Sequence, residues 1–132
     1  MKNSLSQLYQ LNQGVSTKVL RNSVNELPFP LHPSYTELLL ISNGLYSEDS
    51  LALLEIEVLK SRNDDYEVQI YLPNYVMIGD NGGGVALLMK EGDECLYEVD
   101  MGVMDEESMH KSADNLHQFL IEFKGKTLDF RE

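Results

Sequence analysis

The chain has 132 residues and a mass of 15.0 kDa, which suits one domain able to bury a core without disulfides or metals. Asp and Glu outnumber Lys and Arg by 22 to 10, so the formal net charge is −12, and such a surface repels nucleic acid and anionic membranes while it attracts basic partners. Cys95 is the single cysteine, no signal peptide is recognisable, and no apolar run approaches the roughly 20 residues of a membrane helix, so a soluble cytoplasmic protein is expected.

Two short helices are expected at the start of the chain. The first is expected within residues 4–13 with Gly14 as its stop, and the second follows Ser16, a suitable N-cap. The apolar residues spaced for their inner faces are Leu5, Leu8 and Tyr9 in the first helix and Val19, Leu20 and Val24 in the second. Both stripes are narrow, which predicts that these helices lie at the edge of the core.

A third helix carries stronger signals. Residues 26–33 hold three prolines and predict an extended connector, and Pro33 suits the first helical turn, where no N–H is needed. Asn43 and Gly44 then end the helix, because Gly tolerates positive φ. The residues predicted to share one face of this helix are Tyr35, Leu38, Leu39 and Ser42.

The middle of the chain predicts a strand, a helix and another strand. Leu51 to Leu54 is typical of a short buried strand, and residues 55–63 favour a short helix with a polar end. Residues 66–72 alternate with period two, so they predict an edge strand that Pro73 ends.

A glycine-rich break between two apolar runs predicts the centre of the fold. Tyr75 to Gly79 and Gly84 to Lys90 are expected as antiparallel strands, because Asn-Gly between such runs is a strong hairpin signal. Residues 85–89 are apolar on both alternating faces, which places this strand inside the sheet. After a turn over residues 91–94, Cys95 to Asp100 should add a third strand, so a meander results.

The C-terminal part predicts one more helix. Residues 102–111 are interpreted as an acidic connector, Asp114 as an N-cap, Gly125 as the stop and residues 127–132 as a loose tail. The inward residues of this helix would be Leu116, Phe119, Leu120 and Phe123. The predicted fold class is therefore α+β, a single domain over residues 1–132 with a mostly antiparallel central sheet and helices packed against it.

The sequence offers no compelling cofactor or metal site, and none is predicted. The loop of residues 79–84 lacks the Lys-Ser/Thr of a phosphate loop and leads into a strand, so a tight hairpin is favoured over nucleotide binding. No histidine spacing is typical of zinc, although His110 and His117 flank Asp114. Cys95 is interpreted as a buried structural thiol. No catalytic residues are assigned, although two carboxylates in a cleft could still act as acid and base.

Several acidic groups could in principle bind calcium, but none has the ligand spacing of an EF-hand loop. These groups are Glu48 with Asp49, residues 63–65, Asp93 with Glu94, and residues 105–107. A solvated acidic face, which keeps a protein soluble, is their ordinary explanation.

Four segments, taken in order, are similar to motifs of the SUKH superfamily, which is named for the fungal Smi/Knr cell-wall regulator and its bacterial relatives. The first is the Pro-started helix from Pro33 to Gly44, and the second is the short strand and acidic segment of residues 51–66. The third is Ile-Gly-Asp-x-Gly-Gly-Gly with its following strand, residues 78–88, and the fourth is the helix of residues 113–120. Together the resemblance covers about residues 16–123, and we take these as the core of the predicted domain.

Two positions depart from the usual motifs, and both keep apolar character. The Leu-Pro-x-x-Tyr of the family is here Leu31-His-Pro-Ser-Tyr35, and the usual Phe of the last motif is Leu116. The motif positions interpreted as structural are Pro33, Tyr35, Asn43, Gly44, Gly79, Gly83, Leu116 and Phe119.

The resemblance implies a non-enzymatic immunity protein that binds and neutralises a cognate bacterial toxin, often a nuclease. Two alternatives stay open: a regulatory scaffold that binds a host protein, and a small enzyme or ligand-binding protein with a carboxylate-lined cleft. A toxin with a basic surface would suit the acidic surplus of the chain. From charge and predicted loop position, the candidate partner-binding residues are Glu48, Asp49, Asp64, Asp65, Asp80, Asp105 and Glu106.

Overall fold

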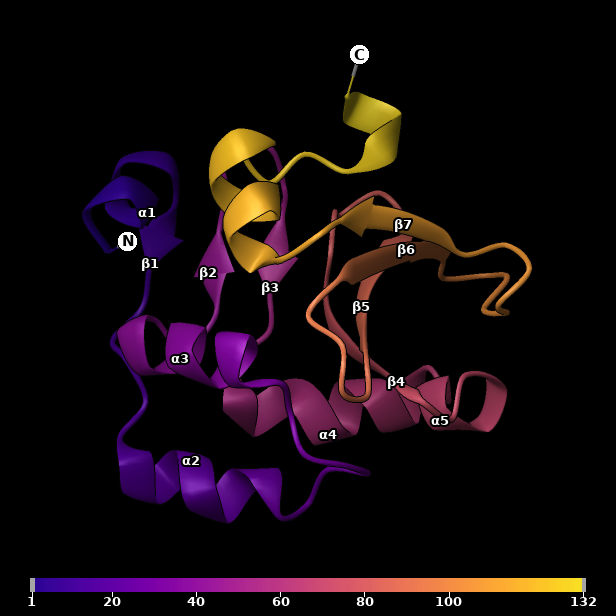
Figure 1. The fold of residues 1–132 in the computed structure, drawn as a ribbon, viewed down its shortest axis with the longest axis horizontal. Helices are drawn as coiled ribbons and strands as arrows, with labels where there is room; N and C mark the ends of the chain where they lie inside the picture. The colour runs from indigo at the N-terminus through magenta and orange to yellow at the C-terminus, as the bar shows by residue number, and fades with distance from the viewer. Residues whose placement is uncertain (1, 132) are drawn as a thin grey trace.

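The computed structural model describes residues 2–131, which form an α+β domain built on a seven-stranded antiparallel sheet (Figure 1). The strands are β1 (Gln10–Leu11), β2 (Leu45–Tyr46), β3 (Ala52–Leu53), β4 (Tyr75–Asp80), β5 (Val85–Lys90), β6 (Leu96–Asp100) and β7 (His110–Ala113). The helices are α1 (Lys2–Leu8), α2 (Thr17–Val24), α3 (Pro33–Ile41), α4 (Ile56–Asp65), α5 (Val68–Tyr71), the π-helical η1 (Gln118–Glu122) and the 3₁₀ turn η2 (Leu128–Phe130). The order of strands in the sheet is the order in the chain, so the sheet is a meander as predicted.

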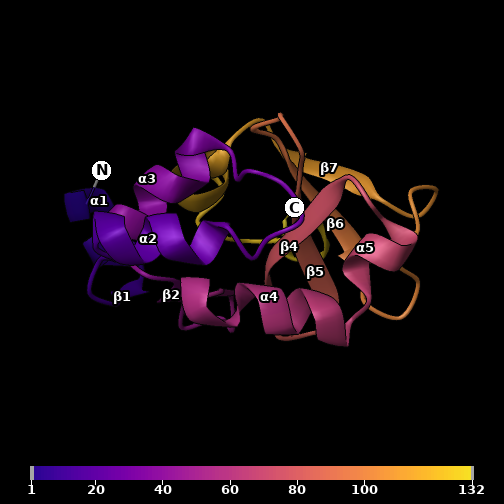
Figure 2. The same cartoon turned by 90° about the horizontal axis from the view of Figure 1, so that it is seen from below.

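Strand β5 lies inside the sheet and is covered on both faces, as its apolar residues predicted. Leu87 and Met89 point into the larger core with residues of α1, α3, α4 and η1, whereas Ala86 and Leu88 point into a smaller core on the other face. Figures 1 and 2 show α4 running from the short strands to the long ones, where it leads into α5. That placement brings Val68 of α5 into the smaller core, where it is fully buried.

The glycine-rich hairpin between β4 and β5 is also confirmed. The Asn81 side chain accepts hydrogen bonds from the N–H groups of Gly83 and Val85, at 2.8 and 3.1 Å. Gly79 has a different role, because a Cβ added there would lie 2.3 Å from the carbonyl oxygen of Ala52 on the neighbouring strand. The Asn81 side chain therefore shapes the turn, and the glycine lets β3 and β4 approach closely.

Three further family-motif residues, Tyr35, Asn43 and Gly44, connect α3 to the segment that starts α4. Tyr35 is buried, and its hydroxyl donates to the carbonyl of Leu54 at 3.1 Å. Asn43 accepts from the N–H of Ile56 at 2.8 Å and donates to the Glu57 carboxylate, while Gly44 has a φ of 75°. Leu116 and Phe119 are buried near the C-terminal end of the same core.

The predicted starts of two helices are confirmed. Ser16 caps α2 by accepting from the N–H of Val19, and Pro33 is the first residue of α3. The first helix is shorter than predicted, because α1 ends at Leu8 and β1 follows within the predicted range. The apolar inner faces of both helices are also narrower than predicted, since Leu8 of α1 and Val19 of α2 are exposed.

The predicted edge strand over residues 66–72 is wrong, because this segment forms the helical turn α5. The connector of residues 102–111 is also shorter than predicted and ends in strand β7. At the last helix, Asn115 rather than Asp114 accepts from the N–H of Gln118, at 2.8 Å. In exchange, the Gln118 side chain accepts from the N–H of Asp114 at 2.7 Å.

The predicted loose tail is corrected as well. Thr127 is fully buried and residues 128–130 form η2, so residues 127–131, called the C-terminal segment below, are held on the domain. Glu132, the remaining residue of the predicted tail, lies outside the described residues. The contacts that hold this segment come from distant parts of the chain.

Candidate partner-binding surface

The seven acidic residues selected from the sequence come from three different parts of the fold. Glu48 and Asp49 lie on the β2–β3 loop, and Asp80 ends β4 opposite Ala52 in the strand pairing. The two other pairs lie elsewhere, Asp64 and Asp65 at the end of α4 and Asp105 and Glu106 on the β6–β7 loop. All are exposed except Asp80, which is half-buried. The fold therefore brings the β2–β3 loop and Asp80 together, whereas the other two pairs lie on segments that pack against the smaller core through Val68 and Met104.

The β2–β3 group has basic neighbours. Asp49 shares an open surface hollow of about 320 Å³ with Lys126 and Phe130. A second hollow beside it is lined by residues that include Lys124 and Arg131. The acids of this group thus face a surface of mixed charge, which weakens any attraction for a basic partner.

The β6–β7 loop is acidic but folds back on itself. Asp105 accepts from the N–H of Ser108 at 2.8 Å, and the neighbouring Met104 is buried in the smaller core. Val103 is the exposed apolar residue of this loop. The loop is therefore anchored by Met104, with Met101 and Met109 also packed against the smaller core, and it offers one exposed apolar side chain beside its carboxylates.

The junction of α4 and α5 has a different composition, and we call residues 64–71 the α4–α5 corner. Its Ile70 and Tyr71 are 70% and 60% exposed, and Tyr66 is 39% exposed. Val68, on the opposite side of the same turn, is fully buried, as is Leu72 just after it. The corner therefore presents three large apolar or aromatic side chains outward while its inner residues fix it to the sheet.

The backbone of the α4–α5 corner turns sharply at one residue. Glu67 adopts the left-handed conformation with a φ of 54°, which an L side chain rarely takes. Its N–H donates to the carbonyl of Asp64 at 3.1 Å, and its own carbonyl accepts from Ile70 at 3.0 Å. This turn separates α4 from α5 and sets the direction of the exposed side chains.

Two buried or partly buried amides hold the corner against β4. Asn63 donates to the carbonyl of Met77 at 3.0 Å and accepts from the Met77 N–H at 2.8 Å, so it pairs with the strand as a backbone would. Gln69 donates to Asn63 at 3.0 Å and to the carbonyl of Tyr75 at 2.7 Å. Because paired buried amides are costly to separate, these hydrogen bonds anchor the corner to β4.

The charges of the α4–α5 corner are acidic and largely uncompensated. Asp64 forms an exposed ion pair with Lys60 at 2.6 Å, whereas Asp65 and Glu67 form no ion pair with any described residue. The pKa of the Lys60 ammonium is raised, chiefly by its hydrogen bond to Asp64. Two free carboxylates thus lie next to the exposed Tyr66, in the same eight-residue segment as Ile70 and Tyr71.

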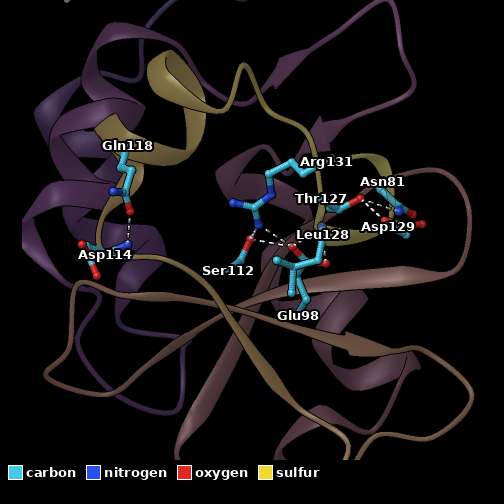
Figure 3. Close-up of polar contacts among 9 residues, drawn as sticks. All are labelled: Asn81, Glu98, Ser112, Asp114, Gln118, Thr127, Leu128, Asp129 and Arg131. Atoms are coloured by element: carbon cyan, nitrogen blue, oxygen red, sulfur yellow. Dashed lines mark hydrogen bonds and ion pairs between the residues drawn. The ribbon is translucent and has the colours of Figure 1, made fainter.

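The C-terminal segment shows the opposite arrangement, since its polar groups turn inward (Figure 3). The buried Glu98 carboxylate accepts from the N–H of Leu128 at 2.9 Å, from the Ser112 hydroxyl, and from the Arg131 guanidinium at 3.3 Å. Arg131 also donates to Ser112 at 2.8 Å and stacks over the Phe123 ring, 4.2 Å from its centroid. Glu98 therefore joins β6, β7 and the C-terminal segment.

A second contact fastens the start of the same segment. The Asn81 amide, which shapes the β4–β5 turn, donates to the Thr127 hydroxyl at 3.0 Å, and that hydroxyl donates to Asp129 (Figure 3). Apart from the Arg131 Nε, the buried side-chain nitrogens and oxygens within residues 2–131 all have partners. The polar side chains around Glu98 and Thr127 therefore bond to other groups of the protein, and their role is to hold the C-terminal segment in place.

The residues considered for metal binding and the lone cysteine are set apart in the structure. Within residues 2–131, no group of three or more His, Cys, Asp or Glu residues is placed to hold a metal ion. Cys95 is half-buried rather than buried as predicted, and burial, followed by the nearby Asp93 carboxylate, raises the pKa of its thiol. The thiolate of a nucleophile is therefore disfavoured there.

Sequence reasoning missed the apolar half of the α4–α5 corner because it assigned that segment to a strand. A helical signal was present, since Val68 and Leu72 are four apart and both apolar. It also missed the partners of the C-terminal segment, for which no local signal exists, because Glu98 and Arg131 are far apart in the chain.

Comparison with known proteins supports the sequence motifs. The chain matches the SMI1 / KNR4 family (SUKH-1) over residues 14–122. Among curated proteins, none matches the chain. In the part of the chain that the structure describes, no helix combines the length and apolar character needed to span a bilayer.

Proposed function

Because the chain belongs to the SMI1 / KNR4 family (SUKH-1), we propose that it is a non-enzymatic binding module, an immunity protein that neutralises a cognate bacterial toxin with a basic surface. The family is generally associated with immunity proteins. In this proposal the protein acts in the cytoplasm of the cell that makes the toxin and covers the surface that the toxin uses.

The observation that carries the proposal is the outward, unpaired state of the carboxylates. The chain has 22 acidic residues, and the ion pairs found within residues 2–131 involve Asp64, Glu98 and Asp114 alone among them. Most of the negative charge is therefore free to act on another molecule. A basic protein is the partner that such a surface attracts.

A nuclease is the toxin class that suits this charge best. It needs a basic groove to hold phosphates, and an acidic protein can occupy that groove in their place. Complementary charge also speeds the encounter, with association rates of up to ~10⁸–10⁹ M⁻¹ s⁻¹ at low salt. Fast capture favours an immunity protein, because the toxin must be bound before it acts.

The test is co-expression with the C-terminal domain encoded by the neighbouring reading frame. We expect this domain to stop growth when it is expressed alone, and we expect the present protein to restore growth and to co-purify with it. A catalytically dead toxin domain then allows affinity and rates to be measured. A host regulator, in contrast, would have no toxic neighbour, and failure to rescue or to co-purify would contradict the proposal.

A further inference from the structure

We propose that the α4–α5 corner is the surface that binds the partner, with Tyr66, Ile70 and Tyr71 as its apolar contacts and Asp65 and Glu67 facing cationic side chains. This inference rests on the proposed function, and it specifies the partner's complementary site. That site is an apolar pocket with Lys or Arg residues at its rim, on a protein.

The corner differs from the other acidic surfaces in combining two properties. Protein interfaces place aromatic and aliphatic residues at their centre and charged residues at their rim. The corner has three exposed apolar side chains within six residues and two unpaired carboxylates beside them. The β2–β3 loop has Lys126 beside its acids, and the β6–β7 loop offers one exposed apolar residue, Val103.

The corner is also prepared for binding before a partner arrives. Asn63 and Gln69 tie it to β4 through hydrogen bonds to Met77 and Tyr75, so its side chains project from a fixed backbone. A rigid surface loses little conformational freedom when it binds, and this favours affinity. Glu67 keeps a strained conformation at the centre of this surface, where a glycine would be the relaxed choice.

Charge decides which occupant fits. In a symmetric dimer through this surface, Asp65 and Glu67 would lie close to the same residues of the second copy, and like charges would oppose association. Nucleic acid and anionic membranes carry the same sign of charge as the corner. A basic protein surface is therefore the occupant for which both the apolar and the charged residues find partners.

The first experimental arm removes the apolar contacts. The double variant Ile70→Ala/Tyr71→Ala is compared with Leu40→Ala/Phe130→Ala, which removes two exposed apolar side chains on α3 and η2. We expect the first variant to raise the Kd for the catalytically dead toxin domain by roughly thirtyfold or more, because central apolar residues dominate interface affinity. The control pair should change the Kd by less than about threefold. Thermal unfolding should be similar for both, since all four side chains are exposed.

The second arm removes the charges. Asp65→Asn/Glu67→Gln should lower the association rate by about three- to tenfold at low salt and make it less sensitive to added salt, because attraction steers the encounter. The matched control is Glu48→Gln/Asp49→Asn, two exposed carboxylates on the β2–β3 loop at the other end of the molecule (Figure 1), for which we expect a change of less than about twofold.

The outcomes separate this inference from the proposed function. If the unmodified protein does not bind the toxin domain, both are overturned. If it binds and the corner variants bind equally well, the inference is overturned while the proposed function stands. If the free protein self-associates in sedimentation velocity and Ile70→Ala/Tyr71→Ala abolishes this, the corner is a contact between copies and the inference is also overturned.

Discussion

The C-terminal segment and the α4–α5 corner use the same kinds of side chain in opposite ways. Around Glu98, carboxylate, hydroxyl and guanidinium groups bond to one another and are withdrawn from solvent. At the corner, the buried amide of Asn63 provides the anchoring, and the carboxylates and aromatic rings face outward. The difference shows that polar pairing fixes the fold, while unpaired groups remain available to a partner. Stability and binding should therefore respond to different substitutions.

The largest effect should come from Glu98→Ala. The substitution leaves the largely buried Arg131 guanidinium and the Leu128 N–H without their acceptor. Breaking a buried pair in this way costs about 3 kcal/mol of unfolding free energy. Urea unfolding followed by circular dichroism measures the loss. The matched control Glu94→Gln, an exposed carboxylate near the start of the same strand, should stay within about 0.5 kcal/mol. Equal losses of unfolding free energy in Glu98→Ala and Glu94→Gln would contradict a special role of Glu98 in stability.

The next effect should come from Asn63→Ala, which loosens the corner from inside. It removes hydrogen bonds to both backbone groups of Met77 and one from Gln69, and we expect a loss of about 2 kcal/mol. Hydrogen exchange should show faster exchange at residues 64–72, with the amides of β5 and β6 less affected. Uniformly faster exchange would mean that the corner is not a separately anchored unit.

Glu67→Gly should have a smaller effect of the opposite sign. Glycine relieves the left-handed strain at this position but adds freedom to the unfolded chain, so a net gain of about 0.5–1 kcal/mol is expected. Lys124→Gly is the matched control, because Lys124 has the same φ of 54° but lies outside the corner. A gain in stability in both, with weaker toxin binding only for Glu67→Gly, would mark Glu67 as a residue kept for binding.

The smallest effect is expected for Asp93, a half-buried carboxylate that is neither enclosed like Glu98 nor fully exposed like Asp65. The N–H of Cys95 donates to Asp93 at 2.9 Å, and this bond is the main reason why the Asp93 pKa is lowered. A lowered folded-state pKa stabilises the protein above the unfolded-state pKa, and the contribution is lost as the pH falls through the folded-state value. Asp93→Asn should therefore cost less than about 0.5 kcal/mol at pH 7, after allowance for solvent screening.

The pH dependence completes this test. The difference in unfolding free energy between the protein and Asp93→Asn should shrink as the pH falls below about 4, where the unfolded-state carboxyl becomes protonated. Urea unfolding at a series of pH values measures it. A difference that grows toward low pH would contradict the direction of the pKa shift.

The sequence predicted those parts of the fold whose signals are local. Asn81 and its glycines predicted the hairpin, Pro33 and Ser16 predicted helix starts, and the apolar residues of β5 predicted a strand covered on both faces. Each of these depends on residues within a few positions of one another. The family resemblance also rested on such local motifs, and the match over residues 14–122 confirms it.

The rest depended on contacts that no short segment reveals. The alternation of apolar and polar residues over 66–72 is compatible with a strand. A helical turn forms instead, because it lets both Val68 and Leu72 pack against the sheet. The C-terminal segment is ordered by Glu98, about thirty residues earlier in the chain. The acidic residues could be chosen from sequence, but their separation into three places and the apolar side chains beside one of them come from the fold.

The meander has a consequence for how the protein is made. Each strand pairs with the one synthesised just before it, so the sheet can assemble in step with translation as the chain leaves the ribosome. Glu98 is an exception to this order, because two of its hydrogen-bond donors lie in residues 127–131, which are synthesised last. In a nascent chain in which those residues have not yet emerged, the Glu98 carboxylate keeps only the hydrogen bond from Ser112 on β7, and the last fastening forms when the Leu128 N–H and the Arg131 guanidinium reach it.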